Sequence, residues 1–191
     1  MQNSSSSLSS FGRARSAPRR RAAGISLLGA LLFGAAVLAS GCHGGASCYD
    51  TYDCDCHGRR ECILGCSRDG CDLACSHTRE SCGAICEDDC RFDCHDTNHC
   101  SAVCGADCDY RCRNVESCAG ECGARCNYVC HDMTHCAARV GPDSTVECRS
   151  VASCEVICDG PCSVTCDPSR CDVRCAPGLT RRSRPGGFVC E

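Results

Sequence analysis

Apolar and polar positions follow a regular series of cysteines over most of this chain. The cysteines are spaced 4, 4, 4 and then 6 residues apart, so the pattern repeats every 18 residues. The regular blocks are Cys82, Cys86, Cys90, Cys94; Cys100, Cys104, Cys108, Cys112; Cys118, Cys122, Cys126, Cys130; and Cys154, Cys158, Cys162, Cys166. A fixed period of this kind predicts a repeat architecture, in which each unit buries its apolar face against its neighbours.

The residues midway between the cysteines distinguish strands from helices, because a spacing of four places residues on one face of either. Each repeat is numbered here from its first cysteine. Position 11 is always aromatic or β-branched, which favours strands, and position 3 is Ala or Gly in all but the last repeat: the pairs are Ala84/Phe92, Ala102/Tyr110, Gly120/Tyr128, Ala138/Val146 and Val156/Val164. Positions 6–8 are rich in turn residues, and Pro161 among them would break a helix.

We therefore predict a small disulfide-rich all-β fold, a β-solenoid-like stack of short strands at positions 1–5 and 9–13. The alternative is a set of short helices with stripes of C-x3-C thiols. Small position 3 facing large position 11 would fill a narrow interior. Since bridged Cα atoms lie about 6 Å apart, the coil should be flat, and we expect Tyr110 and Tyr128 to tilt outward.

The bridges are predicted from the repeat that begins at Cys136, where Val140 and Ser144 replace both inner cysteines. Their joint loss favours bridges from position 1 to 13 and from 5 to 9 within a coil. The expected pairs are Cys82–Cys94, Cys86–Cys90, Cys100–Cys112, Cys104–Cys108, Cys118–Cys130, Cys122–Cys126, Cys136–Cys148, Cys154–Cys166 and Cys158–Cys162. The alternative joins equivalent positions of adjacent coils, whose spacing also permits a bridge.

Composition explains why bridges are needed. The 191 residues include 29 cysteines, all from Cys42 onward, and the chain has no Trp. From residue 42 onward only 18 residues are Leu, Ile, Val or Phe, too few for a conventional core. This excludes a large α/β enzyme and a Leu-core helical bundle. The same part has 15 Arg against 24 acidic residues, which argues against a nucleic-acid partner. None of the common catalytic motifs occurs, so we expect no enzyme.

The N-terminal 41 residues have the layout of an export signal. Residues 1–21 are rich in Ser and Arg, and the uncharged apolar run 22–41 follows. Simple secretion and an uncleaved membrane anchor are two interpretations of this segment. Consecutive arginines suggest twin-arginine export, although the rest of that motif is missing.

The end of this run, Leu38-Ala39-Ser40-Gly41-Cys42, resembles the lipobox of bacterial exported lipoproteins. It departs from that pattern because Leu stands one place early. The resemblance implies a lipid on Cys42, with His43 permitting sorting to the outer membrane. Removing Cys42 from the bridging set leaves an even number of cysteines, which agrees with this interpretation.

Two metal hypotheses stay open. Thiolate storage of Cu or Zn across the chain is the alternative function, although no C-x-x-C pair is present. The second hypothesis concerns two H-D-x-x-H loops that could each hold Zn²⁺ or Cu²⁺, or could simply be polar turns. Their residues are His95, Asp96, His99, His131, Asp132 and His135.

Together these patterns predict a signal at residues 1–41, a linker and N-terminal cap at 42–61, repeats at 62–175 and a loose C-terminal tail at 176–191. The function we expect is a non-enzymatic structural or interaction module of the cell envelope, without a cofactor. Its contacts would be the membrane, through the lipid, and an envelope protein or glycan. Its location would be the outer membrane or cell surface, with secretion as the alternative.

Overall fold

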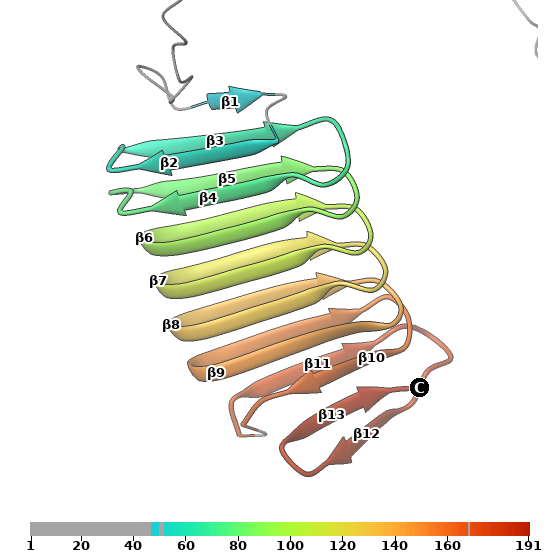
Figure 1. Cartoon of the computed structure of the whole chain (residues 1–191). Helices are drawn as coiled ribbons and strands as arrows, with labels where there is room; N and C mark the ends of the chain where they lie inside the picture. Colours follow the sequence, from blue (N-terminus) through green and yellow to red (C-terminus); the bar gives the residue numbers. More distant parts are fainter. Residues whose placement is uncertain (1–46, 50–51, 168) are drawn as a thin grey trace, which may run out of the picture. The chain divides into compact units, whose positions relative to one another are not determined.

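The computed structural model describes residues 47–49, 52–167 and 169–191, all of which belong to one unit. This part of the chain is a β-solenoid built from parallel strands (Figure 1). The strands are β1 Ser47–Tyr49, β2 Asp53–His57, β3 Glu61–Cys66, β4 Asp72–Ser76, β5 Ser81–Cys86, β6 Arg91–Cys104, β7 Asp109–Cys122, β8 Asn127–Val140, β9 Ser144–Cys158, β10 Cys162–Thr165, β11 Cys171–Cys175, β12 Arg181–Arg184 and β13 Gly187–Cys190. The predicted all-β repeat stack is confirmed. Among the residues described, none forms a helix long and apolar enough to cross a membrane.

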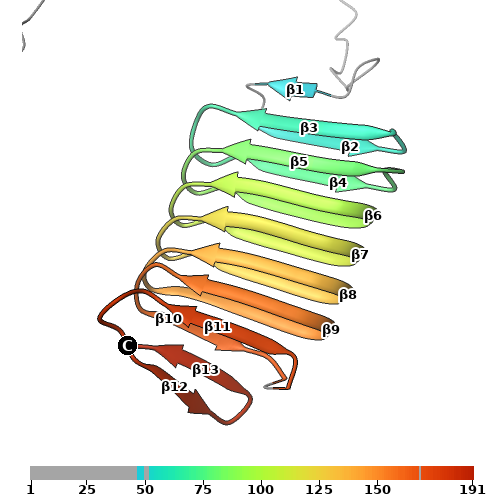
Figure 2. The same ribbon diagram turned by 180° about the vertical axis from the view of Figure 1, so that it is seen from behind.

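The coils form two flat layers, and the same layers are seen from behind in Figure 2. The first layer contains positions 1–5 and runs through β1, β3, β5, the second halves of β6–β9, and β11. The second layer contains positions 9–13 and runs through β2, β4, the first halves of β6–β9, and β10. Neighbouring strands pair in parallel with a shift of one repeat, so equivalent positions stack along the solenoid.

Two corners connect the layers. The five-residue corner comprises positions 14–18, such as residues 95–99, and the three-residue corner comprises positions 6–8, such as residues 105–107. We expected separate strands with turns at both corners, but β6–β9 continue through the five-residue corner and bend there (Figure 1). The bend is at position 15, which has a positive φ in His77, Asp96, Asn114, Asp132 and Ser150. Asn and Asp adopt this conformation more readily than most residues, so the short polar side chains fit the bend.

The core confirms the predicted match of small and large side chains. Phe92, Tyr110 and Tyr128 lie in register on three successive strands and are buried. The ring centroids of Tyr110 and Tyr128 are 4.3 Å apart. A Cβ added at Gly120 would come within 2.9 Å of Cε2 of Tyr128, so only glycine fits opposite this ring.

The expected outward tilt of the two tyrosines is wrong. Tyr110 and Tyr128 are 1% and 0% exposed, and their hydroxyls donate hydrogen bonds to the carbonyls of Ala119 and Ala137. The rings stack face to face along the axis and span the interior from the second layer to the first, where the carbonyl contacts satisfy their polar tips. The interior is therefore wide enough for an aromatic ring when position 3 is small.

The three-residue corner is held by backbone hydrogen bonds between coils. The amide of Gly123 donates to the carbonyl of Gly105 at 2.8 Å, and Gly141 donates to Gly123 at 3.0 Å. Position 8 again has a positive φ, in Asp89, Asp107, Arg125 and Asp143. A Cβ on Gly123 would lie 2.8 Å from the carbonyl carbon of Gly105, so the stacked turns approach too closely for a side chain. Glycine is required here for space rather than for φ.

The C-terminal segment is an ordered cap, not the loose tail we expected. Strand β13 pairs antiparallel with β10, and β12 pairs antiparallel with β13. The Cys175–Cys190 bridge ties this hairpin back, as predicted for Cys190. The guanidinium of Arg181 lies 5.2 Å from the centroid of the Phe188 ring and donates a hydrogen bond to the carbonyl of Val173. The polar strand β12, whose four residues are exposed, ends the stack and protects its open edge.

Candidate functional site

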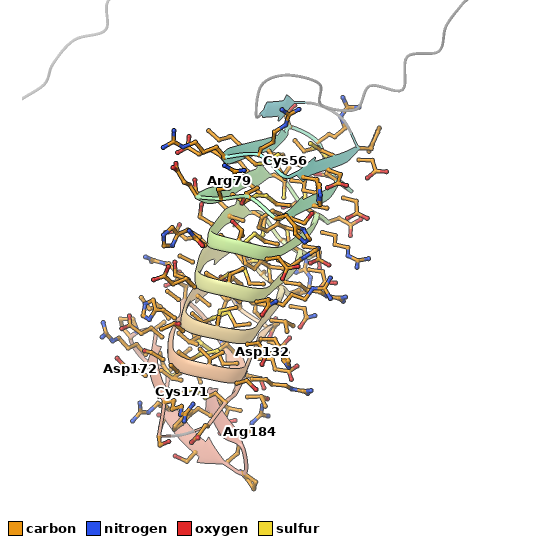
Figure 3. The ribbon with its side chains drawn as sticks, turned by 90° about the vertical axis from the view of Figure 1, so that its left-hand side faces the viewer. Cys56, Arg79, Asp132, Cys171, Asp172 and Arg184 are labelled. Carbon is orange, nitrogen blue, oxygen red and sulfur yellow. A yellow bond between two sulfur atoms is a disulfide. The ribbon has the colours of Figure 1, made fainter. Side chains whose placement is uncertain are left out.

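Cysteine sulfurs gather inside the coils at the two corners, while charged side chains project outward (Figure 3). At the five-residue corner, position 13 of each repeat is bridged to position 1 of the next. The bridges are Cys56–Cys62, Cys75–Cys82, Cys94–Cys100, Cys112–Cys118, Cys130–Cys136, Cys148–Cys154 and Cys166–Cys171. The expected bridges Cys82–Cys94, Cys100–Cys112, Cys118–Cys130, Cys136–Cys148 and Cys154–Cys166 are therefore wrong.

The error has a geometric cause. In a stacked coil, position 1 lies between position 13 of its own repeat and position 13 of the repeat before. The sulfurs of Cys130, Cys136 and Cys148 all lie within 4.8 Å of one another, and so do those of Cys75, Cys82 and Cys94. The residue pattern allows both partners, and the structure uses the one across the shorter loop.

The three-residue corner is bonded less uniformly. It contains the bridges Cys66–Cys71, Cys122–Cys126 and Cys158–Cys162, and the last two are among the expected pairs from position 5 to 9. Where Val140 and Ser144 replace the cysteines, both residues are buried. The hydroxyl of Ser144 accepts a hydrogen bond from the amide of Cys126 and donates one to the carbonyl of Gly123, so this coil closes without a bridge.

Four cysteines at the same corner are not bridged in the structure. Cys86, Cys90, Cys104 and Cys108 are free thiols, so the expected bridges Cys86–Cys90 and Cys104–Cys108 are not formed. The sulfurs of Cys86, Cys90 and Cys108 lie within 4.8 Å of one another, and Cys104 lies within the same distance of Cys108. We call these four residues the thiol cluster.

Hydrogen bonds and burial shift the pKa values of the thiol cluster. Hydrogen bonds from Cys104 and Cys86 stabilise the thiolate of Cys108 and lower its pKa. Hydrogen bonds with Cys104 and Cys108 raise the pKa of Cys86, and the hydrogen bond with Cys108 raises the pKa of Cys104. The pKa of Cys90 is raised by burial. One member of the cluster therefore carries a thiolate more readily than the other three.

Backbone carbonyls and acidic residues surround the cluster. The Cys90 sulfur lies 3.5 Å from the carbonyl oxygen of Glu87, and the Cys108 sulfur lies 3.5 Å from that of Ala106. The turn above is acidic, since Glu87, Asp88 and Asp89 precede Cys90. Its Asp88 carboxylate accepts a hydrogen bond from the amide of Ala106 at 2.7 Å. Carbonyl dipoles and carboxylates make this corner attractive to cations.

The two H-D-x-x-H loops lie at the five-residue corner, two coils apart. His95 pairs in register with Arg113, and Arg113 pairs with His131. Nδ1 of His95 is 2.9 Å from Asp96 Oδ2, and Nδ1 of His131 is 2.7 Å from Asp132 Oδ2. Each aspartate is thus brought to the histidine that precedes it.

The second histidine of the first loop is directed elsewhere. Nδ1 of His99 lies 2.7 Å from Oγ of Ser117 on the next coil, while Asp96 accepts a hydrogen bond from the side-chain amide of Asn114. His135 stacks in register with Ser117 and Ser153. These contacts support the interpretation as polar turns, in which hydrogen bonds link one coil to the next.

Two further histidines, which the H-D-x-x-H pattern does not include, lie at this corner. Nε2 of His77 lies 3.8 Å from Asp96 Oδ2, and the His77 ring centroid is 4.8 Å from that of His57 and 6.0 Å from that of His95. Position in the repeat could have identified His57, because it directly follows a cysteine at position 13, as His95 and His131 do. The looser spacing of the first blocks concealed this equivalence.

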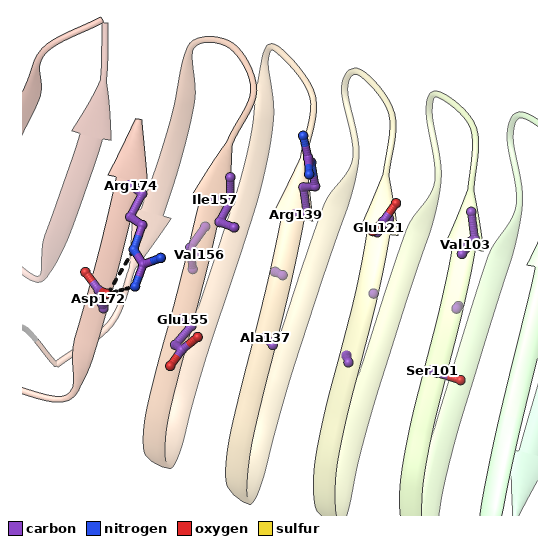
Figure 4. Close-up of a pocket in the computed structure, with 14 residues that line it drawn as sticks. Ser101, Val103, Glu121, Ala137, Arg139, Glu155, Val156, Ile157, Asp172 and Arg174 are labelled. Atoms are coloured by element: carbon purple, nitrogen blue, oxygen red, sulfur yellow. Dashed lines mark hydrogen bonds and ion pairs between the residues drawn. The ribbon is translucent and has the colours of Figure 1, made fainter. Parts of the chain in front are cut away.

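A shallow groove crosses the outer face of the first layer (Figure 4). Its volume is about 390 Å³, and its floor includes the small residues Ser101, Ala119 and Ala137. Along one side Val103, Glu121, Arg139 and Ile157 stack in register on successive strands. The ion pair of Arg174 with Asp172, at 2.9 Å, lies at the C-terminal end of the groove.

Comparison with known proteins adds no assignment, since no family model, no curated protein and no solved structure matches this chain. The predicted lipidation site Cys42 and its neighbour His43 lie outside the described residues.

Proposed function

We propose that this chain is a non-enzymatic, exported structural or interaction module, attached to the cell envelope by lipid on Cys42. The observation that carries the proposal is the series of bridges at the five-residue corner, one for each coil from Cys56 to Cys171. Structural disulfides persist in oxidising compartments and are rare in the cytosol. Export is the route by which a chain built in this way meets such conditions.

The bridges also explain how so small a core can be stable. Its large buried side chains are few, and cysteines occupy many of the remaining buried positions. Each bridge contributes about 2–4 kcal/mol by restricting the unfolded chain. Thiolate storage of metal along the whole chain would instead need most of these cysteines reduced, so the bridged pairs favour the structural role.

The outer face of the first layer is the surface we assign to partner contact. Ile85, Val103 and Ile157 are large apolar residues that remain exposed on this face, at 62%, 51% and 39%. Exposed apolar side chains on a flat, disulfide-bonded sheet favour a protein partner, because binding a glycan would require more hydrogen-bonding groups. The partner expected here is therefore an envelope protein.

The proposal is tested by fractionating cells that express the full chain. The native chain should sediment with outer membranes, and Cys42→Ala should release it in soluble form because the lipid has no attachment site. His43→Asp is the matched control, since it leaves Cys42 in place and should move the chain to the inner membrane. Membrane association that survives Cys42→Ala would show that residues 22–41 form the anchor and would overturn the lipoprotein assignment.

A further inference from the structure

We propose that Cys86, Cys90, Cys104 and Cys108 form a thiolate site for one thiophilic d¹⁰ cation, Cu(I) or Zn(II). The site is local to the three-residue corner of two adjacent coils, and it coexists with the bridges elsewhere. It differs from storage along the whole chain, because only these four cysteines take part. The proposal does not depend on export or on lipid attachment.

The spacing of the sulfurs matches such a site. Zn–S bonds are about 2.3 Å long, which places the sulfurs of a tetrahedral site about 3.8 Å apart. Three cluster sulfurs already lie within 4.8 Å of one another, and Cys104 lies within that distance of Cys108. The Cys104 sulfur, which lies 3.2 Å from that of Cys122, must turn toward the other three for all four to surround one ion.

Burial supports a site that retains its ion. Cys86, Cys90 and Cys108 are buried, whereas Cys104 is partly exposed and provides access. The carbonyl oxygens of Glu87, Gly105 and Ala106 lie 3.5–3.6 Å from the sulfurs of Cys90 or Cys108. They direct negative ends of dipoles toward the cluster, which stabilises a cation there.

The neighbouring coil provides the contrast. Cys122 and Cys126 have the same spacing as Cys104 and Cys108, and they are bridged with their Cα atoms 6.3 Å apart. Their turn contains Arg125, which forms an ion pair with Asp107 at 2.6 Å, where the preceding turns contain Asp107 and Asp89 at the same position. Among these three successive turns, the two acidic ones carry the reduced cysteines and the basic one carries the bridged pair, whereas Cys158–Cys162 is bridged beside Asp159.

Binding involves proton release and no change of oxidation state. Each thiol that ligates the ion loses its proton to solvent, and its sulfur donates a lone pair to the metal. Neither an oxidant nor a reductant is consumed. Because the ligands must be deprotonated, affinity should fall as the pH is lowered.

The test uses the purified full chain under native conditions, with Zn(II) alone or Cu(I) alone as the probe. We expect one ion per chain by native mass spectrometry. We also expect four thiols that react with an alkylating reagent only after the metal is removed by a chelator. Peptide mapping should place the four labels on Cys86, Cys90, Cys104 and Cys108. The arm that yields the tighter complex identifies the metal.

Two double variants locate the site. Cys86→Ser with Cys108→Ser should abolish binding of the ion, because two of the three closest sulfurs are removed. Cys158→Ser with Cys162→Ser removes a bridge at the same corner whose sulfurs lie outside the thiol cluster, and it should leave the stoichiometry unchanged. Circular dichroism of both variants checks that the β-structure is retained.

Two results would overturn the proposal. One is a native chain without reactive thiols, whose mass and peptide map show the bridges Cys86–Cys90 and Cys104–Cys108. The other is a chain whose four thiols are free but bind neither metal. Both are measured on the unmodified chain, so the proposal remains falsifiable even if a double variant fails to fold.

Discussion

The two corners of the solenoid use cysteine differently. At the five-residue corner, position 13 is bridged to the following position 1 in every coil from Cys56 to Cys171. At the three-residue corner the equivalent sites are bridged in some coils, occupied by Val140 and Ser144 in one, and reduced in the thiol cluster. The fold thus uses a bridge at one corner throughout and accepts three chemical states at the other.

The local structure of the corners explains this difference. The three-residue corner has a short turn, a stack of glycines and hydrogen bonds such as that of Asp107 to Ala124 at 2.8 Å. It therefore holds its shape without sulfur. The five-residue corner spans a longer bend and encloses a buried residue at position 16, such as Val115 or Met133. A bridge there ties the two layers together over this residue, and the sulfurs fill space that few other side chains occupy.

The largest expected effect comes from removing one bridge from each corner, which tests directly whether the two corners depend on sulfur to different extents. We expect Cys112→Ser with Cys118→Ser to lower the free energy of unfolding by about 3 kcal/mol, through lost restriction of the unfolded chain and two buried hydroxyls. Cys122→Ser with Cys126→Ser should cost less, about 2 kcal/mol, because the backbone ladder of that corner remains. Urea unfolding under non-reducing conditions measures both. Equal losses would show that the corners contribute alike.

The glycine stack can be tested separately from sulfur. Gly123→Ala places a Cβ 2.8 Å from the carbonyl carbon of Gly105, which is rigid backbone, so two coils must separate. We expect a loss of about 1–3 kcal/mol in the free energy of unfolding. Gly83→Ala is the matched control, because its Cβ would meet nothing closer than 3.6 Å and its φ is not positive. A control as destabilised as Gly123→Ala would remove close packing as the explanation.

Introducing cysteines at Val140 and Ser144 tests the three-residue corner further, with a smaller expected effect on stability. Val140 pairs in register with Cys122 and Cys158, and Ser144 pairs with Cys162, so this site lies between two bridged coils. In Val140→Cys with Ser144→Cys we expect a bridge, seen as the loss of two hydrogens in the intact mass. Stability should rise by about 1 kcal/mol, since the gain from the bridge is offset by the lost hydrogen bonds of Ser144. Two free thiols in this variant would show that the turn itself disfavours bridging.

The sequence predicts the solenoid well because its physical signals are local and repeated. Successive residues of a strand point to opposite faces, so the sequence shows which residues around the cysteines face inward and that small Gly120 lies opposite large Tyr128. The partners of position 1 are not predictable in this way, because Cys136 lies near both Cys130 and Cys148. That choice depends on how the five-residue corner bends, which the sequence shows only through the tolerance of Asp96 and its equivalents for positive φ.

In the candidate sites, contacts between residues adjacent in sequence could be predicted, and contacts made by the stacking of coils could not. The pairs His95–Asp96 and His131–Asp132 are adjacent in sequence, so their contacts could be foreseen. The approach of His77 to Asp96 depends on stacking between coils and could not. The thiol cluster is also a product of stacking, since Cys86 and Cys90 come from one coil and Cys104 and Cys108 from the next. Residues one period apart become neighbours only once the repeat is known to be a solenoid turn.

The smallest expected effect is on the pH dependence of stability, through Asp96 and Asp107, which occupy the positive-φ positions of the two corners. Hydrogen bonds from His95 and Asn114 lower the pKa of Asp96, and a hydrogen bond from Arg125 lowers that of Asp107. A carboxyl whose pKa is depressed in the folded state stabilises the fold above its unfolded pKa of about 4, and this contribution is lost as the pH falls through the folded value.

Asp96→Asn and Asp107→Asn remove the charge but keep a side chain that tolerates positive φ. We expect each variant to be slightly less stable than the native chain near neutral pH, and the difference to vanish as the pH falls below about 4. Asp96 has two hydrogen-bonding partners and is less exposed than Asp107, at 36% against 46%, so its difference should be the larger. Thermal unfolding at a series of pH values measures this. A difference that persists at low pH would mean that the amide disturbs the bend itself, and that the carboxylate charge contributes nothing to either corner.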